Sequence, residues 1–196
     1  MFRASKTRFP ALAVLLALTC LALAPHALRA ETEVYGGLGI GYSTFQVDAI
    51  DFEGSTFANR QFLGFTWGDY VGVEAGFIDL GTVDDRIANQ PGQQSLNKGI
   101  ETWGYNLAVV GRYPLNQELH AIAKLGMIRW DSEATIEPFP LPAKEDGNDF
   151  IWGIGLDFRG SGRFHVRVEG ELVDIEFADS WWVLTTSVMY SFPLGR

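Results

Sequence analysis

The sequence contains a single cysteine and, after its first 30 residues, no long apolar run. Cys20 lies in an N-terminal apolar stretch and follows Thr19, where a lipoprotein signal needs a small residue, so we expect no lipid anchor. The rest of the chain has no cysteine, which fits an exported protein that is stabilised without disulfide bonds. No later stretch approaches the roughly 18 apolar residues of a transmembrane helix. If the protein lies in a membrane, it must cross it with strands.

Basic residues are also scarce. Without residues 1–30, the chain has 11 basic and 24 acidic residues, a formal net charge of −13. Nucleic-acid binding needs a basic face for the phosphates, so we expect no nucleic-acid partner. Most of the charge lies in four segments, with 16 acidic and four basic residues in 44–58, 79–101, 129–149 and 174–180. These segments either bind divalent cations that bridge to lipopolysaccharide phosphates, repel anionic ligands, or form a solvated acidic surface.

The N-terminal residues have the order of a secretory signal peptide. Three basic residues precede an apolar run over residues 11–24, and Ala30 offers a cleavage site. The run is too short to span a bilayer as a helix, which needs about 20 residues. We therefore expect residues 1–30 to be a cleaved signal peptide and residues 31–196 to form a single domain.

Apolar and polar residues alternate with a period of two in eight segments, and helical periodicity is absent after the signal peptide. The connections alternate between short turns and longer polar loops, the latter at residues 44–58, 81–99 and 131–148. Short turns at one end and long loops at the other are typical of outer-membrane barrels. We predict an all-β fold, an eight-stranded antiparallel up-and-down transmembrane β-barrel. Its strands are expected at 33–43, 59–68, 70–80, 100–113, 119–130, 149–158, 163–174 and 181–192.

One face of every predicted strand is apolar, and the opposite face combines glycine with charge. The interior of an eight-stranded barrel is just wide enough for side chains, so ten glycines on this face make room for long charged ones. A buried charge must be paired, because an unpaired one costs several kcal/mol. Four acidic and four basic residues are therefore predicted to form a luminal charge network: Arg60, Glu74, Arg112, Lys124, Asp157, Arg167, Glu169 and Glu171.

Aromatic residues gather near both ends of the predicted strands, as the two interfaces of a bilayer select. A soluble periplasmic lipid-binding barrel would instead turn its apolar face inward. The two belts favour a membrane barrel with its apolar face toward lipid. They comprise Trp67, Tyr70, Tyr113, Phe158, Phe164 and Tyr190 at the turn end, and Tyr42, Phe77, Trp103, Phe150, Trp152, Trp181 and Trp182 at the loop end.

Several segments resemble a known family. Residues 63–67 and 73–81 are similar to the second and third strands of OmpA-like small outer-membrane β-barrel domains. Residues 123–126 and 153–156 resemble the fifth and sixth strands, and residues 167–171 the charged seventh strand. The resemblance covers the whole chain after the signal peptide. It implies a Gram-negative outer-membrane location, and in related barrels such a luminal network acts as a plug or gate.

The resemblance also implies a C-terminal signal for the barrel-assembly machinery, formed by Thr185, Ser187, Tyr190 and Phe192. The signal departs from the family pattern in two respects. Ser187 replaces the usual glycine, and four residues follow a phenylalanine that is normally last. These departures concern recognition during assembly more than the fold.

No residue pattern calls for catalysis. Glu169 and Glu171 share a strand face, about 7 Å apart, and paired carboxylates can act as acid and base, but basic residues on the same face offer them salt bridges. His120 and His165 also face the lumen, yet a tetrahedral metal site needs three or four ligands. No serine adjoins His165, as a lipid-hydrolysing nucleophile would require. We predict no catalytic residue, no metal site and no cofactor.

The predicted function is a structural or surface-interaction role in the outer membrane. The expected partners are outer-membrane lipids, lipopolysaccharide, the assembly machinery and a surface ligand that the sequence does not identify. Three alternatives stay open: a narrow, porin-like pore for ions or small solutes, a lipid A-modifying enzyme, and the soluble periplasmic barrel.

Overall fold

The computed structural model describes residues 32–47, 52–87, 96–137, 139–174 and 180–194. The predicted signal peptide lies outside these residues, as do the acidic residues at positions 48, 51, 176 and 179. Within the described ranges, the chain has no helix that is long and apolar enough to cross a membrane.

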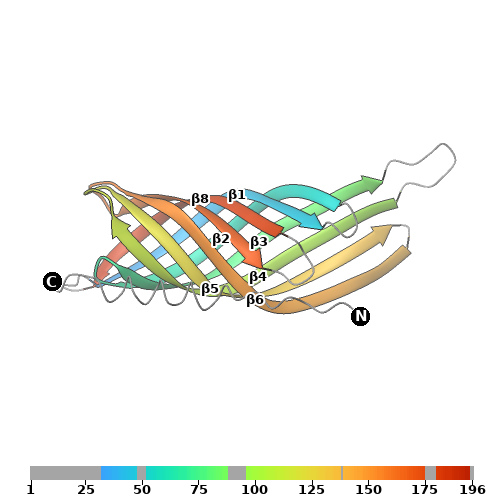
Figure 1. Cartoon of the computed structure of the whole chain (residues 1–196), viewed down its shortest axis with the longest axis horizontal. Coiled ribbons are helices and arrows are strands. Elements are labelled where there is room, and N and C mark those ends of the chain that lie inside the picture. The colour runs from blue at the N-terminus through green and yellow to red at the C-terminus, as the bar shows by residue number, and fades with distance from the viewer. Residues whose placement is uncertain (1–31, 48–51, 88–95, 138, 175–179, 195–196) are drawn as a thin grey trace, which may run out of the picture.

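The described residues form eight antiparallel strands that close into a single barrel in sequence order (Figure 1). Each strand pairs with its chain neighbours, and β1 pairs with β8 to complete the wall. The predicted fold class is confirmed. The strands are β1 Thr32–Val47, β2 Phe52–Trp67, β3 Val71–Ile87, β4 Leu96–Pro114, β5 Leu119–Glu137, β6 Phe139–Arg159, β7 Phe164–Asp174 and β8 Ser180–Leu194.

The strands are staggered around the barrel. A ladder of paired residues that starts at Tyr35 on β1 passes Glu74 on β3 and Trp181 on β8, and it returns to β1 at Phe45, ten residues further on. This shear tilts every strand and sets the barrel diameter. The shear also determines which luminal side chains lie at the same height along the barrel axis, because each step along the ladder from one strand to the next moves toward the same end of the barrel.

Short connections join the strands at one end of the barrel, here called the turn end. The turn between β2 and β3 uses Gly68 with a φ of 66°, a left-handed conformation that glycine adopts without strain. In the turn between β4 and β5, the Asn116 side-chain oxygen accepts hydrogen bonds from the amides of Glu118 and Leu119, both at 2.8 Å. Local hydrogen bonding of this kind is why asparagine favours turns.

The opposite end corrects the prediction of three long loops. The pairing of β1 with β2 continues to Val47 and Phe52, that of β3 with β4 to Ile87 and Leu96, and that of β5 with β6 almost to their junction. Alternation marks a strand only where one face meets lipid and the other the lumen. Beyond the lipid this contrast is lost: on β6, residues 144–146 are all exposed, so the alternation disappears there although the hydrogen-bonded ladder continues.

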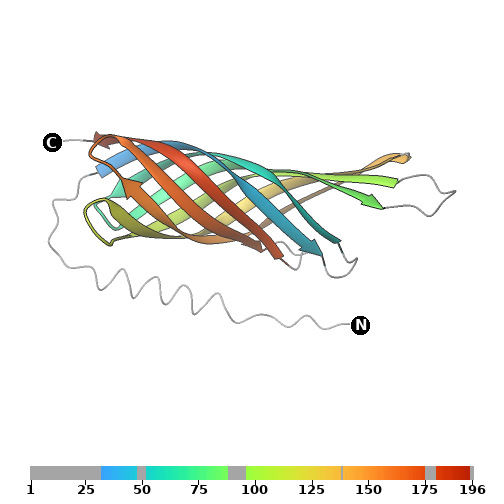
Figure 2. The same cartoon turned by 90° about the horizontal axis from the view of Figure 1, so that it is seen from above.

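Strands β3 to β6 extend beyond the rest of the wall (Figures 1 and 2). The pairing of β2 with β3 ends at Asn59 and Asp79, and that of β6 with β7 ends at Phe150 and Asp174. Past these points the four strands pair only with one another, and they form a sheet that we call the blade. It comprises residues 82–87, 96–102, 131–137 and 139–149.

A β-bulge marks where the blade leaves the barrel wall. The register between β3 and β4 shifts between Asp79 and Thr82, and Gly81 has a φ of 77°. The Asp79 carboxylate accepts a hydrogen bond from the Gly81 amide at 2.9 Å and one from the Asn59 side-chain amide at 3.0 Å. A bulge bends its strand and increases the local twist, which here separates β3 from β2.

We expect Gly81→Val to destabilise the barrel by about 1–2 kcal/mol, because a branched residue is strained at positive φ. Its Cβ would also meet the Phe57 carbonyl oxygen across the bulge. Urea unfolding in lipid vesicles measures the loss, and limited proteolysis reports whether the blade loosens. Gly111→Val is the control, since the nearest atom to its Cβ lies at 3.8 Å. Equal losses in the two variants would contradict the role assigned to the bulge.

Candidate functional site

The side chains on the two faces of the barrel wall show which face contacts the membrane. Apolar side chains point outward all around the barrel, and the exposed fraction reaches 74% at Ile40 and 81% at Phe57. The charged side chains of Arg60 and Arg167 are buried inside, with exposed fractions of 1% and 0%. This arrangement excludes the soluble lipid-binding barrel, which would place its apolar face in the interior. The outer wall contacts membrane lipids.

Most of the predicted belt aromatics do face outward, often in contact with one another, but Trp181 is a correction. Its exposed fraction is 3%, and its indole N–H donates a hydrogen bond to the Ser43 hydroxyl inside the lumen at 2.6 Å. Adjacent residues of a strand point to opposite faces, so Trp181 and Trp182 cannot both meet lipid. Trp182, which is 50% exposed, is the one that faces outward.

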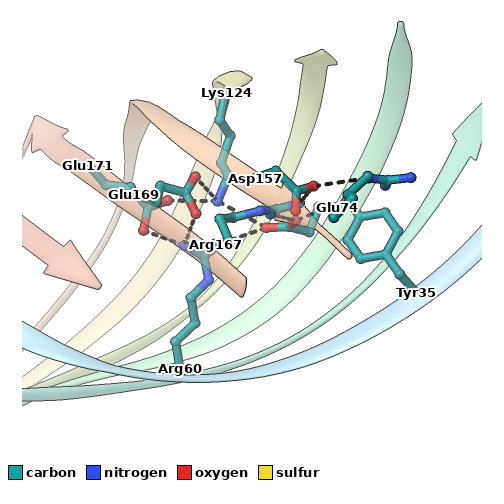
Figure 3. Close-up of polar contacts among 9 residues, drawn as sticks. Tyr35, Arg60, Glu74, Lys124, Asp157, Arg167, Glu169 and Glu171 are labelled. Atoms are coloured by element: carbon teal, nitrogen blue, oxygen red, sulfur yellow. Dashed lines mark hydrogen bonds and ion pairs between the residues drawn. The ribbon is translucent and has the colours of Figure 1, made fainter. Parts of the chain in front are cut away.

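Six charged side chains meet at the centre of the lumen (Figure 3), and we call them the central network. They come from four strands: Arg60 on β2, Glu74 on β3, Lys124 on β5, and Arg167, Glu169 and Glu171 on β7. Three cations face three carboxylates, and all six side chains have exposed fractions of at most 1%. The charges therefore balance, and none of the six side chains is open to bulk solvent.

The carboxylate of Glu74 is the hub of the central network. It lies 2.8 Å from a guanidinium nitrogen of Arg60, 2.9 Å from the ammonium of Lys124 and 2.6 Å from a guanidinium nitrogen of Arg167. It also accepts a hydrogen bond from the Tyr35 hydroxyl at 3.1 Å. One carboxylate on β3 thus links its own strand to four others of the wall: β1, β2, β5 and β7.

The carboxylates on β7 complete the network. The Lys124 ammonium lies 2.6 Å from Glu169 and 2.9 Å from Glu171. Arg60 contacts both, with a direct salt bridge to Glu171 and a distance of 3.4 Å to Glu169. Charge-assisted contacts of this kind are stronger than neutral hydrogen bonds. They cross-link β2 and β5 to β7 through the interior.

The other two charges of the predicted network lie closer to the turn end. Asp157 is fully buried, but its carboxylate is 3.6 Å from Arg159 and 3.8 Å from Arg167, which is longer than a hydrogen bond. Within the described ranges, no carboxylate forms a salt bridge with Arg112. Its guanidinium instead lies over the Tyr35 ring, 4.8 Å from the centroid. Such cation–π contact stabilises a desolvated guanidinium in part.

Two aromatic rings fill the space that luminal glycines leave. Tyr35 on β1 lies opposite Gly64 on β2, and Phe62 on β2 lies opposite Gly37 on β1. A Cβ at either glycine would collide with the facing ring. The Arg167 guanidinium is 5.4 Å from the Tyr35 centroid and 5.3 Å from that of Phe62. The two glycines therefore leave room for the two rings, and the rings contact the Arg167 guanidinium of the central network.

An apolar layer closes the lumen on the blade side of the central network, and the sequence-based prediction missed it. We call it the apolar cap. On β3 and β5, the cap residues continue the inward-facing period of two from Glu74 and Lys124 toward the blade. This continuation of the period is the feature of the sequence from which the cap could have been predicted. The cap consists of Ala58, Ile78, Leu80, Ile128, Trp130, Ile151, Val173, Trp181 and Val183, all with exposed fractions of 4% or less.

The remaining predicted positions do not form one site. His120 and His165 face the lumen near the turn end, where their cross-strand neighbours are Asp157 and Arg159. No group of three His, Cys, Asp or Glu side chains is arranged to hold a metal ion in the described part of the chain. Of the predicted assembly signal, Thr185 and Ser187 are buried in the lumen, whereas Phe192 is exposed and Tyr190 half-exposed. The Tyr190 and Phe192 rings contact each other on the outer wall, 4.6 Å apart.

Comparison with known proteins identifies the family. The model of the outer membrane protein beta-barrel domain matches residues 13–192. No curated protein sequence matches this chain.

Solved structures share the fold at low sequence identity. Ail, the attachment invasion locus protein of Yersinia pestis, was solved in complex with the heparin analogue sucrose octasulfate; it is 13% identical, with a TM-score of 0.59 over 83% of this chain and 99% of its own. Neisserial surface protein A is 7% identical, with a TM-score of 0.63 over 81% and 97%. The N-terminal β-barrel domain of Pseudomonas aeruginosa OprF is 11% identical, with a TM-score of 0.57 over 84% and 100%. With a barrel that faces lipid, encloses its charges and matches the family model over most of its length, this chain belongs to the outer membrane protein beta-barrel domain family.

Proposed function

We propose that this outer-membrane barrel is a closed scaffold that holds the acidic blade at the cell surface, where the blade binds a basic protein. The observation that carries the proposal is the blade itself, a paired four-stranded sheet that extends from one end of the barrel only. It contains nine acidic and three basic residues, a net charge of −6. A paired, charged projection on a filled barrel favours interaction at a surface over transport.

The filled lumen supports a scaffold rather than a pore. A solute passing through would have to displace the central network, whose side chains are fully buried, and then the apolar cap. Separating buried, paired charges costs several kcal/mol. A narrow ion pore, the first alternative, is therefore disfavoured by two successive barriers of different chemistry.

The negative charge of the blade favours a positively charged partner. Ail was solved with a polysulfated, hence anionic, ligand. A blade with a net charge of −6 repels a ligand of that kind, because like charges at an interface oppose association. We therefore assign the blade a partner of opposite charge.

The blade edges are unsuited to binding a partner by strand addition. On β6, Pro140 and Pro142 lie in the stretch that pairs with β5 alone. Proline has no backbone N–H to donate, and charged residues on both outer strands also discourage pairing with another chain. Recognition through the side chains of the blade faces remains, and its strength depends on charge.

The proposal is tested by neutralising two exposed blade acids, Glu101→Gln with Glu145→Gln. We expect this double variant, in phosphatidylcholine nanodiscs, to bind a surface coated with a basic protein such as lysozyme about 3–10-fold more weakly, mainly through slower association. Binding kinetics by surface plasmon resonance at two salt concentrations measure the effect. The nanodiscs contain no lipopolysaccharide, so cation-bridged lipid cannot account for it.

The matched control removes the same charge from the turn end, by Asp69→Asn with Glu118→Gln, both at exposed positions. This variant should bind as the unmodified protein does. Equal weakening in both double variants would mean that total charge, not the blade, determines binding. Tighter binding to immobilised heparin than to the basic protein would overturn the assigned partner.

We further infer that residues 1–30 are removed on export and that the β8 signal is read by the assembly machinery. Membership of a family of outer-membrane barrels supports both steps. We propose no enzymatic role. The cross-strand neighbours of His165 are Arg159 and Met189, and those of His120 are Pro114 and Asp157, so neither histidine faces a hydroxyl or thiol nucleophile across the sheet.

A further inference from the structure

Polar groups at the two ends of the lumen differ in how completely they are paired. Around the apolar cap, the hydroxyls of Thr102 and Ser132 bond each other at 2.9 Å, and the Trp130 indole donates to the Asp149 carboxylate at 2.5 Å. The Ser43 hydroxyl accepts from the Trp181 indole. Apart from Asn106 at the inner boundary of the cap, no buried side-chain nitrogen or oxygen among the described residues at this level lacks a hydrogen-bond partner.

From the central network to the turn end, the opposite holds. Both carboxylate oxygens of Asp157 lack a hydrogen-bond partner, and so do Nε and Nη2 of Arg112 and Nδ1 of His165. Asp157, Arg112 and His165 have exposed fractions of only 0%, 5% and 6%. Further unpartnered atoms toward the turn end belong to Glu33, His120, Arg159, Arg167 and Ser191. Those of Arg60, Glu169 and Thr185 lie at the level of the central network, and those of Asn106 lie at its boundary with the apolar cap, across the sheet from Ile128.

These groups are close enough to share bridging molecules. Asp157 lies directly across the sheet from His120 on one side and from Arg167 on the other. Its distances of 3.6 Å and 3.8 Å to two guanidinium groups are too long for direct bonds and short enough for a shared solvent molecule. Leaving a buried charged group unsatisfied costs several kcal/mol, so some partner must complete these bonds.

We propose that the turn-end half of the lumen holds ordered water, which joins Asp157 to the surrounding arginines and histidines, while the apolar cap keeps the blade end dry. Water fits because the orphaned groups include donors and acceptors in one place, and buried water typically makes two to four bonds to such groups. An anion does not fit, because Asp157 occupies the same space. Half-buried His120 and Arg159 lie at the turn end, where the water enters. The lumen is then a dead-end cavity that exchanges with the periplasm and is sealed toward the outside.

Hydroxyl-radical labelling tests this with a matched pair of methionines. Met189 is 1% exposed and lies directly across from His165, in the region proposed to be wet. Leu80→Met places the same side chain in the cap at a position with 0% exposure, and this exchange nearly conserves volume. Radicals formed by an X-ray pulse oxidise buried side chains that contact bound water. Mass spectrometry of the intact barrel in nanodiscs gives each rate, divided by the rate in the unfolded chain.

We expect the normalised oxidation of Met189 to exceed that of the introduced methionine about tenfold, since only Met189 lies beside polar groups that retain water. Equal rates, or faster oxidation at position 80, would overturn the proposal. If Leu80→Met fails to fold, Trp130 and Trp181 of the unmodified protein replace it, because both belong to the cap. Oxidation of these tryptophans as extensive as that of Met189 would then have the same meaning.

Discussion

The Glu74→Gln variant is expected to lose about 3–5 kcal/mol of unfolding free energy, the usual effect of removing one partner from a buried ion pair. Glutamine keeps the shape of the side chain but removes the charge that three cations share. Arg167 is affected most, because among the described residues its only other carboxylate within 4 Å is Asp157 at 3.8 Å. Guanidinium unfolding in lipid vesicles, followed by tryptophan fluorescence and by heat-modifiable gel migration, measures the loss.

Two further variants make this prediction specific. Asp146→Asn breaks the surface pair with Arg129, whose side chains are both 60% exposed, and should cost less than about 1 kcal/mol. Adding Lys124→Met to Glu74→Gln restores the charge balance of the lumen and should recover part of the stability, because an apolar replacement of a buried pair is often tolerated. A Glu74→Gln variant no less stable than Asp146→Asn would show that the central network is not a source of stability.

Gly64→Val should prevent the barrel from closing or reduce its stability by about 3 kcal/mol, the upper range for overpacking an interior. A side chain at position 64 collides with the Tyr35 ring, which cannot move without losing its bond to Glu74 and its contact with Arg112. Loss of the compact, heat-modifiable band after refolding into detergent, together with circular dichroism, measures the effect.

A second glycine serves as the control for this prediction. Gly170 on β7 faces outward, and no atom lies within 4 Å of the position of its Cβ. Gly170→Val should therefore fold normally, and valine suits a lipid-facing strand position. If both variants refold equally well, the space beside Tyr35 is not limiting, and the pairing of rings with glycines lacks the role given to it here.

The eight strands and the direction of their faces could be predicted because lipid and lumen impose opposite requirements on alternate residues. Ile40 meets lipid and Arg60 meets the interior for the same reason, and this reason acts along every strand within the membrane. The blade could not be predicted in this way. On β6, the consecutive blade residues Lys144, Glu145 and Asp146 are all exposed, so they carry no alternation although they pair with β5.

The contacts between side chains within the lumen also could not be predicted from the sequence. Arg60 and Glu171 meet because a shear of ten residues brings β2 and β7 to the same depth, and a different shear would pair other residues. The apolar cap was missed because its residues face inward where charge was expected. Trp181 illustrates this: its neighbour Trp182 is equally apolar, so hydropathy does not distinguish the inner residue from the outer one.

The luminal contacts bear on how the barrel reaches its final state. Arg60 and Glu171 are 111 residues apart in the chain, and Trp181 and Ser43 are 138 apart. Such pairs cannot form until β8 has met β1, and contacts between distant segments make folding slow. Before closure, the six charges have no complete set of partners and remain hydrated. Most of the stability is therefore gained only when the barrel closes, in a single cooperative step. A chain interrupted before β8 retains almost none of this stability.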